Sequence, residues 1–221
     1  AAVRALMEDQ TLRIGVELEV FKGLPLAGGM GGSASSAVAA VVAVNELLGL
    51  GLQSDQLLEY ALVGETQAAG APSPDNAAPS LLGGLVLVPS WNPLKAIPLE
   101  VPRDLFSVHV HPHMEVRTEG ARRILGTQVP LQNAIAQWGN TVALVAGLFR
   151  EDWEIIARAV EDRVAEPHRA AAVPGFFEVK KAALEAGALA ASLSGSGPSL
   201  FALCRGRARA EAVGQEMVEA F

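Results

Sequence analysis

Residues 24–36 form a glycine- and serine-rich run between two segments of different pattern. The run reads Leu-Pro-Leu-Ala-Gly-Gly-Met-Gly-Gly-Ser-Ala-Ser-Ser. Alternating apolar residues from Leu12 to Phe21 predict a strand before it, and the Ala/Val-rich stretch Ala37 to Leu48 predicts a helix after it. Glycines let backbone N–H groups turn toward one point, and the helix adds the positive end of its dipole. The run therefore predicts an anion cradle, above all for phosphate; a simple turn with a serine N-cap is the alternative.

Two well-known phosphate loops fit this run less well. A Walker A loop ends in Gly-Lys-Ser/Thr, and no lysine lies between Lys22 and Lys95. The spacing Gly29-x-Gly31-x-x-Ala34 does fit a dinucleotide-binding loop, which requires a second parallel strand after the helix. Here Gly49-Leu50-Gly51 leads instead into another predicted helix, Gln56 to Ala69. The dinucleotide interpretation is therefore disfavoured.

The run resembles the phosphate-binding loop of the GHMP small-molecule kinases, P-x-x-x-G-L-G-S-S-A. Pro25, Gly29, Gly31, Ser33 and Ala34 fall on that pattern. Met30 replaces its leucine, and Gly32 departs from its usual serine while still offering an N–H group. The resemblance implies that ATP phosphates bind along the loop, at Pro25, Leu26, Ala27, Gly28, Gly29, Met30, Gly31, Gly32, Ser33, Ala34 and Ser35.

Composition excludes several other classes of protein. The chain has 221 residues, 50% of them hydrophobic, which is enough for a sizeable core in one or two domains. A net charge of −7 without any Lys/Arg run argues against a nucleic-acid-binding surface. No apolar run reaches the roughly 18 residues of a membrane span. The single cysteine, Cys204, excludes an internal disulfide and favours a cytoplasmic setting, and we expect it to be a small buried residue.

The prolines from Pro89 to Pro93, with Pro98 and Pro102, predict a linker, which divides residues 1–90 from residues 91–221. The second part mixes strands and helices, as an α+β domain does. We expect strands at 105–111, 188–193 and 199–204, and helices at 118–125, 131–149, 152–160, 175–186 and 208–221. The GHMP kinase resemblance implies a two-domain α+β architecture, with an N-terminal α/β half and a ferredoxin-like C-terminal half.

Glu65 lies on the apolar face of its predicted helix. It follows Leu58, Ala61 and Leu62 by seven, four and three residues, so the carboxylate shares their stripe. A carboxylate there is costly unless something pairs with it, and a divalent cation is one suitable partner. The alternative is a side chain near the helix end that bends out to solvent. The resemblance implies that Glu65 and Ser33 hold Mg²⁺.

Residues 71–84 resemble a stretch of the homoserine kinase family, H-P/A-D-N-V-A-P-A-L-L-G-G. Asp75 and Asn76 match positions that line the substrate pocket of that family, while Ser73 replaces its usual histidine. From the residues alone, Asp75 or Asn76 is also a candidate N-cap of a short helix into Leu81-Leu82.

Two arginines match positions that bind the substrate carboxylate in the same family. Thr118-x-x-Ala121-Arg122 resembles its S-T-x-x-A-R motif, and Asp162-x-x-x-Glu166-Pro167-x-Arg169 resembles its D-x-x-x-E-P-x-R motif. Arginine grips a carboxylate with a bidentate fork. The resemblance implies substrate contacts at Thr118, Arg122 and Arg169. The residues alone favour a solvated surface charge for each arginine.

Ser194-Gly195-Ser196-Gly197-Pro198-Ser199 lies between two predicted strands and, taken alone, predicts a hairpin turn. It also resembles the third GHMP kinase motif, S-G-A/S-G-P-T/S, which implies a substrate contact at Gly195. His109, His111 and His113 alternate and would share one face of a strand, but Pro112 interrupts them. No motif supports a metal site there, and we assign none.

The resemblance to the homoserine kinase family covers nearly the whole chain in order. It implies ATP- and Mg²⁺-dependent phosphorylation of the side-chain hydroxyl of L-homoserine, in threonine biosynthesis, with no dedicated general base. A homodimer is one candidate assembly. The alternatives are another GHMP kinase, acting on mevalonate or shikimate, and a non-catalytic binding module on the same fold. The family's first motif, P-x-S/T-x-N-L-G-x-G-F-D, has no counterpart before the glycine loop, so we expect it in a segment that precedes Ala1.

Overall fold

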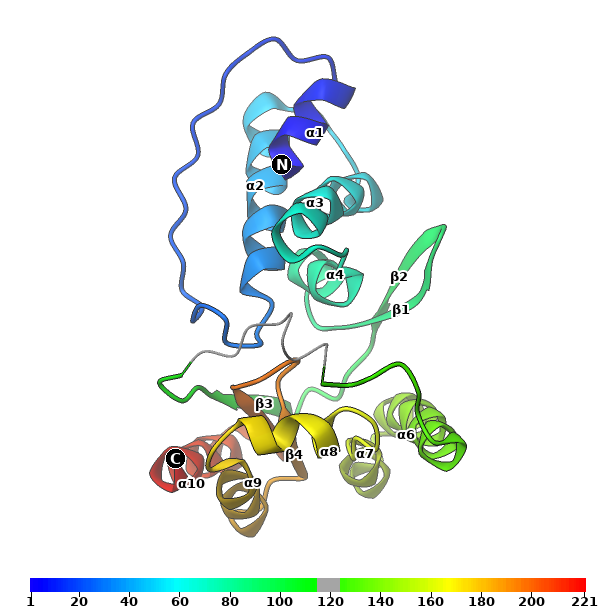
Figure 1. Cartoon of the computed structure of the whole chain (residues 1–221), viewed down its shortest axis with the longest axis vertical. Helices are drawn as coiled ribbons and strands as arrows, with labels where there is room; N and C mark the ends of the chain where they lie inside the picture. Colours follow the sequence, from blue (N-terminus) through cyan, green and yellow to red (C-terminus); the bar gives the residue numbers. More distant parts are fainter. Residues whose placement is uncertain (115–123) are drawn as a thin grey trace. The chain divides into compact units, whose positions relative to one another are not determined.

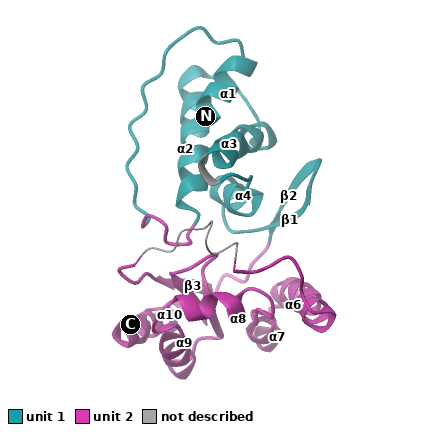
Figure 2. Ribbon diagram, in the orientation of Figure 1, with its two compact units in different colours: residues 1–24, 31–99 teal, residues 25–30, 100–221 magenta. Residues whose placement is uncertain are grey.

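The computed structural model describes residues 1–114 and 124–221, without the side chains of residues 68 and 69. The chain divides into two compact units (Figure 2). Unit 1 comprises Ala1–Leu24 and Gly31–Leu99, and unit 2 comprises Pro25–Met30 and Glu100–Phe221. The glycine-rich run is therefore shared: its first part belongs to unit 2, and its last part begins a helix of unit 1.

Unit 1 packs its helices around one apolar core and ends in a β-hairpin (Figure 1). The helices are α1 (Ala2–Asp9), α2 (Gly32–Leu48), α3 (Ser54–Ala69) and α4 (Pro74–Leu82). The core contains fully buried side chains from the first three helices, among them Leu6, Val41, Val44, Leu58 and Ala61. No strand intervenes between α2 and α3, so the requirement of a dinucleotide-binding loop is not met.

The prediction of a strand from Leu12 to Phe21 is wrong for the part of the chain that the structure describes. The segment is extended, but none of the described residues pairs with it as a strand. Leu12 and Val16 pack against the core of unit 1, whereas Ile14 and Val20 are 50% and 56% exposed. The alternating pattern is genuine, but a strand also needs a neighbour for its N–H and C=O groups.

Pro98 and Pro102 of the predicted linker flank the boundary between the two units, at Leu99 and Glu100, but the part of the linker from Pro89 to Pro93 is wrong. These residues belong to the hairpin formed by β1 (Leu85–Trp91) and β2 (Leu94–Leu99), in which Trp91 pairs with Leu94. Pro89 lies where the pairing register shifts, between Leu87 and Ser90, and Pro93 lies in the turn. At both places the residue does not have to donate a backbone N–H to the neighbouring strand. Proline, which has no N–H, is therefore tolerated there.

Unit 2 is built on an antiparallel sheet in the order β3-β5-β4. The strands are β3 (Leu105–Val110), β4 (Ala190–Leu193) and β5 (Leu200–Arg205). Helices α9 (Phe176–Glu185) and α10 (Arg207–Ala220) pack against this sheet and share its core, which includes Phe176, Leu200, Val213 and Met217. The unit also contains α6 (Leu131–Arg150), α7 (Trp153–Ala159), α8 (Glu166–Arg169) and a 3-10 turn at Ala170–Ala172. The predicted α+β class is confirmed.

Most elements predicted in the second half agree with the structure within a few residues. The helix predicted at 118–125 lies almost entirely outside the described residues, which resume at 124. Within the described part of the chain, no helix is long and apolar enough to cross a membrane.

Candidate active site

Helix α2 begins at Gly32, the last glycine of the loop, which is five residues earlier than the predicted start at Ala37, and ends at Leu48 as predicted. Gly31 is its N-cap, with a left-handed backbone at φ 66°, and no side chain caps the helix. A β-carbon at Gly31 would also lie 3.3 Å from the Asn76 side-chain oxygen. The first N–H groups of a helix have no partner within the helix. The start of α2 is therefore suited to an anion, because its N–H groups and its dipole both favour negative charge.

The hydroxyl groups around this first turn have different roles. Ser35 and Ser36 donate to the carbonyl oxygen of Gly32 at 3.1 and 2.9 Å. Ser33 is exposed, and its hydroxyl has no hydrogen bond among the described residues. Ser33 thus has an O–H that is still available to donate to a ligand, whereas Ser35 and Ser36 keep only their acceptor lone pairs.

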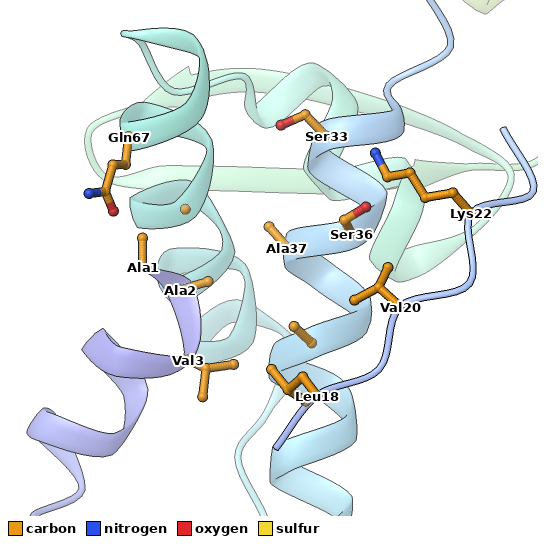
Figure 3. A pocket seen from close by; sticks show the side chains of 12 residues that line it. Ala1, Ala2, Val3, Leu18, Val20, Lys22, Ser33, Ser36, Ala37 and Gln67 are labelled. Atoms are coloured by element: carbon orange, nitrogen blue, oxygen red, sulfur yellow. The ribbon is translucent and has the colours of Figure 1, made fainter. Parts of the chain in front are cut away.

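Lys22 is a site residue that the sequence did not predict. Its ammonium group donates to the same Gly32 carbonyl oxygen at 3.0 Å, and Figure 3 shows it reaching toward the turn that carries Ser33 and Ser36. Nothing in the local sequence distinguishes it from a surface lysine. The fold brings the extended segment alongside α2 and so adds a positive charge to the start of that helix.

A cavity of about 550 Å³ lies beside this turn, within unit 1 (Figure 3). Lys22, Ser33 and Ser36 line it from one direction, and Gly64 and Gln67 of α3 line it from another. Helices α2 and α3 approach closely here, because a β-carbon at Gly64 would lie 3.2 Å from that of Ala37. Ala37 is one helical turn after Ser33. The glycine at position 64 therefore allows α3 to pack next to the start of α2.

Glu65 follows directly and is buried, with only 3% of its surface exposed. The predicted position on the apolar face of α3 is confirmed, and the alternative of a side chain bent out to solvent is wrong. Its Oε1 atom is buried and has no hydrogen-bond partner among the residues that the structure describes. A buried carboxylate oxygen without a partner is costly, and a bound cation would compensate it.

This environment fits Mg²⁺ held jointly by protein and nucleotide. Magnesium usually takes one or two carboxylates together with phosphate oxygens. Among residues 1–114 and 124–221, no group of three or more His, Cys, Asp or Glu side chains could hold a metal ion. Histidines 109, 111 and 113, all among these described residues, are therefore not gathered into such a group. The assignment of Mg²⁺ to Glu65 and Ser33 stays a prediction, and phosphate oxygens would have to complete so small a set of donors.

Asp75 and Asn76 lie in the first turn of α4, close to the end of the glycine loop. The helix begins at Pro74 with Ser73 as N-cap, so the alternative in which Asp75 or Asn76 caps it is wrong. Asn76 faces Gly31, as the contact above shows, whereas Asp75 is exposed. The Asp-Asn turn is thus next to the start of α2, within the same unit.

In unit 2, the first part of the glycine loop is held against the 194–199 turn. The Ser194 hydroxyl donates to the carbonyl oxygen of Gly29 at 3.0 Å, and the Ser199 N–H donates to that of Gly28 at 3.4 Å. A β-carbon at Gly29 would lie 2.2 Å from the Ser194 carbonyl oxygen, so only glycine fits. Two glycine-rich segments far apart in the sequence therefore form one structure.

His111 supports this arrangement from just beyond the end of β3. Its Nδ1 is hydrogen-bonded to the Ser199 hydroxyl at 2.9 Å, and its ring would contact a β-carbon at Gly28 at 3.3 Å. His109 lies within β3, and desolvation lowers its pKa, which favours the neutral ring at pH 7. His111 packs under the phosphate loop, a role that no sequence motif indicated.

Arg169 ends helix α8 and donates from Nη1 to the Gly195 carbonyl oxygen at 3.0 Å. Two members of the predicted substrate site therefore touch within unit 2. The other members in this half, Thr118 and Arg122, lie outside the described residues.

Comparisons with known proteins agree with this geometry. The family models for the GHMP kinases N terminal domain and the GHMP kinases C terminal domain match residues 1–84 and 144–221. The homoserine kinase of Chlorobaculum tepidum is 50% identical over 206 residues, which cover 93% of this chain and 64% of that protein. The homoserine kinase of Xylella fastidiosa is 40% identical over all 221 residues and is covered to 68%. A crystal structure of homoserine kinase from Cytophaga hutchinsonii superposes with a TM-score of 0.97 at 46% identity, covering 100% of this chain and 70% of that one.

The fold, the glycine loop and the two matched domains define a GHMP kinase. The chain spans just under two thirds of the Chlorobaculum relative and slightly more of the others. The chain is 40% or more identical to homoserine kinases along its whole length, which identifies its family within the GHMP kinases. It belongs to the homoserine kinase family.

Proposed function

We propose that the protein transfers the γ-phosphoryl group of ATP to the side-chain hydroxyl of L-homoserine and forms O-phospho-L-homoserine, a step of threonine biosynthesis. The observation that carries the proposal is the unpartnered buried oxygen of Glu65, on the helix that packs beside the start of α2. A structural carboxylate would have a partner. A kinase needs a carboxylate for the cation that accompanies its nucleotide.

On the nucleotide side, backbone N–H groups of the glycine loop and the first turn of α2 bind the phosphates. Lys22 adds a mobile positive charge to the same turn. Glu65 and the Ser33 hydroxyl would hold Mg²⁺, which when bound supplies charge neutralisation to the β- and γ-phosphates. The burial of Glu65 favours the loaded state, because the ion compensates an oxygen that is otherwise without a partner.

On the substrate side, Asp75 and Asn76 offer hydrogen-bonding groups in the first turn of α4. Arg169 would bind the substrate carboxylate, oriented by its bond to Gly195. Thr118 and Arg122 complete this set by their match to the family motif. An amino-acid substrate carries both an ammonium and a carboxylate, and this set contains groups of both complementary charges.

Phosphoryl transfer of this kind depends on positioning and charge stabilisation more than on covalent chemistry. The residues proposed here hold both reactants and neutralise phosphate charge. We assign no general base; Asp75 is assigned to substrate binding. As the hydroxyl oxygen bonds to the γ-phosphorus, the bond from that phosphorus to the ADP oxygen would break, ADP would leave, and the hydroxyl proton would pass to solvent.

The test is turnover by the full chain in a coupled assay of ADP release, with L-homoserine, mevalonate and shikimate as acceptors. We expect turnover with L-homoserine alone, dependent on Mg²⁺, with the product identified by ³¹P NMR. The carboxyl-reduced analogue L-homoserinol should react poorly, because it removes the partner of Arg169. Turnover with another acceptor in place of homoserine would overturn the substrate assignment, and no turnover with any acceptor would favour a binding module.

A further inference from the structure

Helix α8 is a single turn whose start is held by one carboxylate. Oδ1 of Asp162 accepts hydrogen bonds from the backbone N–H groups of Val164 and Ala165 at 2.7 and 2.8 Å. Its Oδ2 accepts one from the N–H of Glu166 at 3.1 Å. The Glu166 N–H belongs to the first turn of the helix, where backbone N–H groups lack partners within the helix, and the other two come from the N-cap Ala165 and the residue before it. Asp162 therefore fixes the backbone that enters α8 and leads to Arg169.

Glu166, the first residue of α8, connects the helix to two other elements. Its Oε1 pairs with the ammonium of Lys180 on α9 at 2.5 Å, and its Oε2 accepts the hydroxyl of Ser192 on β4 at 2.6 Å. The Glu166 side chain is only 15% exposed and Ser192 only 5%. Lys180 also lies over the ring of buried Phe176, 5.7 Å from its centre. Both carboxylate oxygens are therefore engaged with the core of unit 2.

A second contact joins helix α8 to the segment that runs from β4 into the 194–199 turn. It lies three residues further along both segments. Glu166 binds Ser192, and Arg169 binds the carbonyl oxygen of Gly195. Residues three apart on a helix lie on one face, so the anchor and the arginine face the same way. The two cross-links fix both the angle of α8 and the path from β4 into the 194–199 turn.

We propose that Glu166 is a positioning residue that sets the orientation of Arg169 toward the substrate carboxylate; the inference rests on the proposed function. An arginine side chain loses considerable rotamer entropy when a ligand orders it. An anchored helix and a fixed acceptor at Gly195 order it in advance. Glu166 does not touch substrate and acts only through Arg169.

The alternative is that the Glu166–Lys180 pair serves stability alone. Partly buried ion pairs are weak evidence for stability, because desolvation offsets much of their attraction. Glu166→Gln separates the two roles well. Glutamine keeps an acceptor for Ser192 and a similar volume, but it loses the ion pair with Lys180. The exposed Glu178 of α9 provides the matched control, Glu178→Gln.

The experiment is steady-state kinetics of the full chain for wild type, Glu166→Gln, Arg169→Ala, the double variant and Glu178→Gln. We expect Glu166→Gln to raise KM for L-homoserine about 10- to 100-fold, as misplacement of a binding group does. KM for ATP should change less than about twofold, because Glu166→Gln removes none of the contacts proposed to bind the nucleotide. In the Arg169→Ala background, Glu166→Gln should have no further effect on KM for homoserine. Glu178→Gln should behave as wild type.

Additive effects in the double variant would overturn the proposal, since Glu166 would then act independently of Arg169. So would a loss of thermal stability with both KM values unchanged. If Glu166→Gln folds poorly, the combined variant Glu166→Gln and Lys180→Met replaces it in the same set of kinetic measurements. Methionine at position 180 removes the ammonium group that Glu166→Gln leaves without its ion-pair partner.

A second readout does not depend on turnover. The Nε–H signal of Arg169 in a ¹⁵N spectrum, assigned by its loss in Arg169→Lys, should shift or broaden in Glu166→Gln. An unchanged signal refutes the positioning role even if the protein phosphorylates homoserine. If the Arg169 signal changes in Glu166→Gln but the wild-type protein does not phosphorylate homoserine, the positioning role is supported and only the proposed function is refuted.

Discussion

The Ser194 hydroxyl donates to the carbonyl oxygen of Gly29 at 3.0 Å, although 165 residues separate them in the sequence. This bond joins the phosphate loop to the second glycine-rich turn of unit 2. It requires the backbones to approach so closely that Gly29 has no room for a β-carbon. Gly29 thus serves close packing, in addition to the phosphate binding that we propose for the loop.

Gly29→Ala should therefore lower the free energy of unfolding by more than the positive φ of residue 29 alone would cause. Gly29 has φ 74°, and its β-carbon would overlap the carbonyl oxygens of Ser194 and Gly197 at 2.2 and 2.6 Å. Gly51→Ala is the matched control, with φ 69° and no atom within 4 Å. The control should cost about 1–2 kcal/mol of unfolding free energy for its left-handed backbone. Gly29→Ala should cost more and raise KM for ATP; equal effects of the two variants in denaturant titrations would contradict this.

Lys22→Met should weaken ATP binding without unfolding the protein. The ammonium group lies at the first turn of α2, where phosphate charge would accumulate. Removing one partly solvated charge contact should raise KM for ATP roughly 5- to 20-fold, which corresponds to about 1–2 kcal/mol. Lys95→Met on β2 changes an exposed lysine in the same unit and should leave KM unaltered. Similar KM values for both variants would show that Lys22 is only a surface charge.

Glu65→Met should stabilise the metal-free protein while it abolishes activity. Replacing a buried, uncompensated carboxylate by an apolar side chain of similar size should add about 1–3 kcal/mol to the unfolding free energy. Turnover should fall on the order of 100-fold or more, as it does when a group that stabilises transition-state charge is lost. Thermal melts without Mg²⁺ and ATP, beside assays with both, test the two halves. Glu59→Gln on the exposed face of α3 is the control. A lower melting temperature for Glu65→Met would point to a structural partner for this carboxylate.

Cys204 should be unreactive in the native protein. Its side chain is fully buried, and desolvation raises its pKa, although Arg209 acts in the opposite direction. A raised pKa reduces the thiolate fraction at any pH below it, and the thiolate is the reactive form. Because Cys204 is the only cysteine, titration with a disulfide reagent reports on it directly. We expect negligible labelling at pH 8 and full labelling in denaturant; rapid native labelling would be incompatible with this burial.

The position of Glu65 shows how far local pattern reaches. Its spacing from Leu58 and Ala61 predicted a carboxylate on a buried helix face, and the structure confirms that burial. Helical periodicity alone carries this information, because residues at spacings of three, four and seven share a face. The role of Glu65 as a Mg²⁺ ligand remains a proposal, since it comes from the family motif and the unpartnered oxygen.

Two other predictions were wrong because the local sequence pattern does not show which backbone segment lies alongside. The alternating segment 12–21 has the pattern of a strand, but no described residue pairs with it. The prolines near residue 90 predicted a linker, but the hairpin accommodates them at a register shift and a turn. In both cases the outcome depends on which backbone lies alongside, and that is not written in the segment itself.

The sequence by itself determined the glycine loop, the helix that follows it, the buried face that carries Glu65, and the order of motifs that marks the family. These depend on backbone freedom and periodicity, which act over a few residues. Only the tertiary structure decided that Lys22 reaches Gly32, that Ser194 binds Gly29, and that Glu166 anchors the helix of Arg169. Each of these contacts joins segments whose separation is set by packing of the whole unit, and hydrophobic burial, which drives that packing, does not specify individual partners.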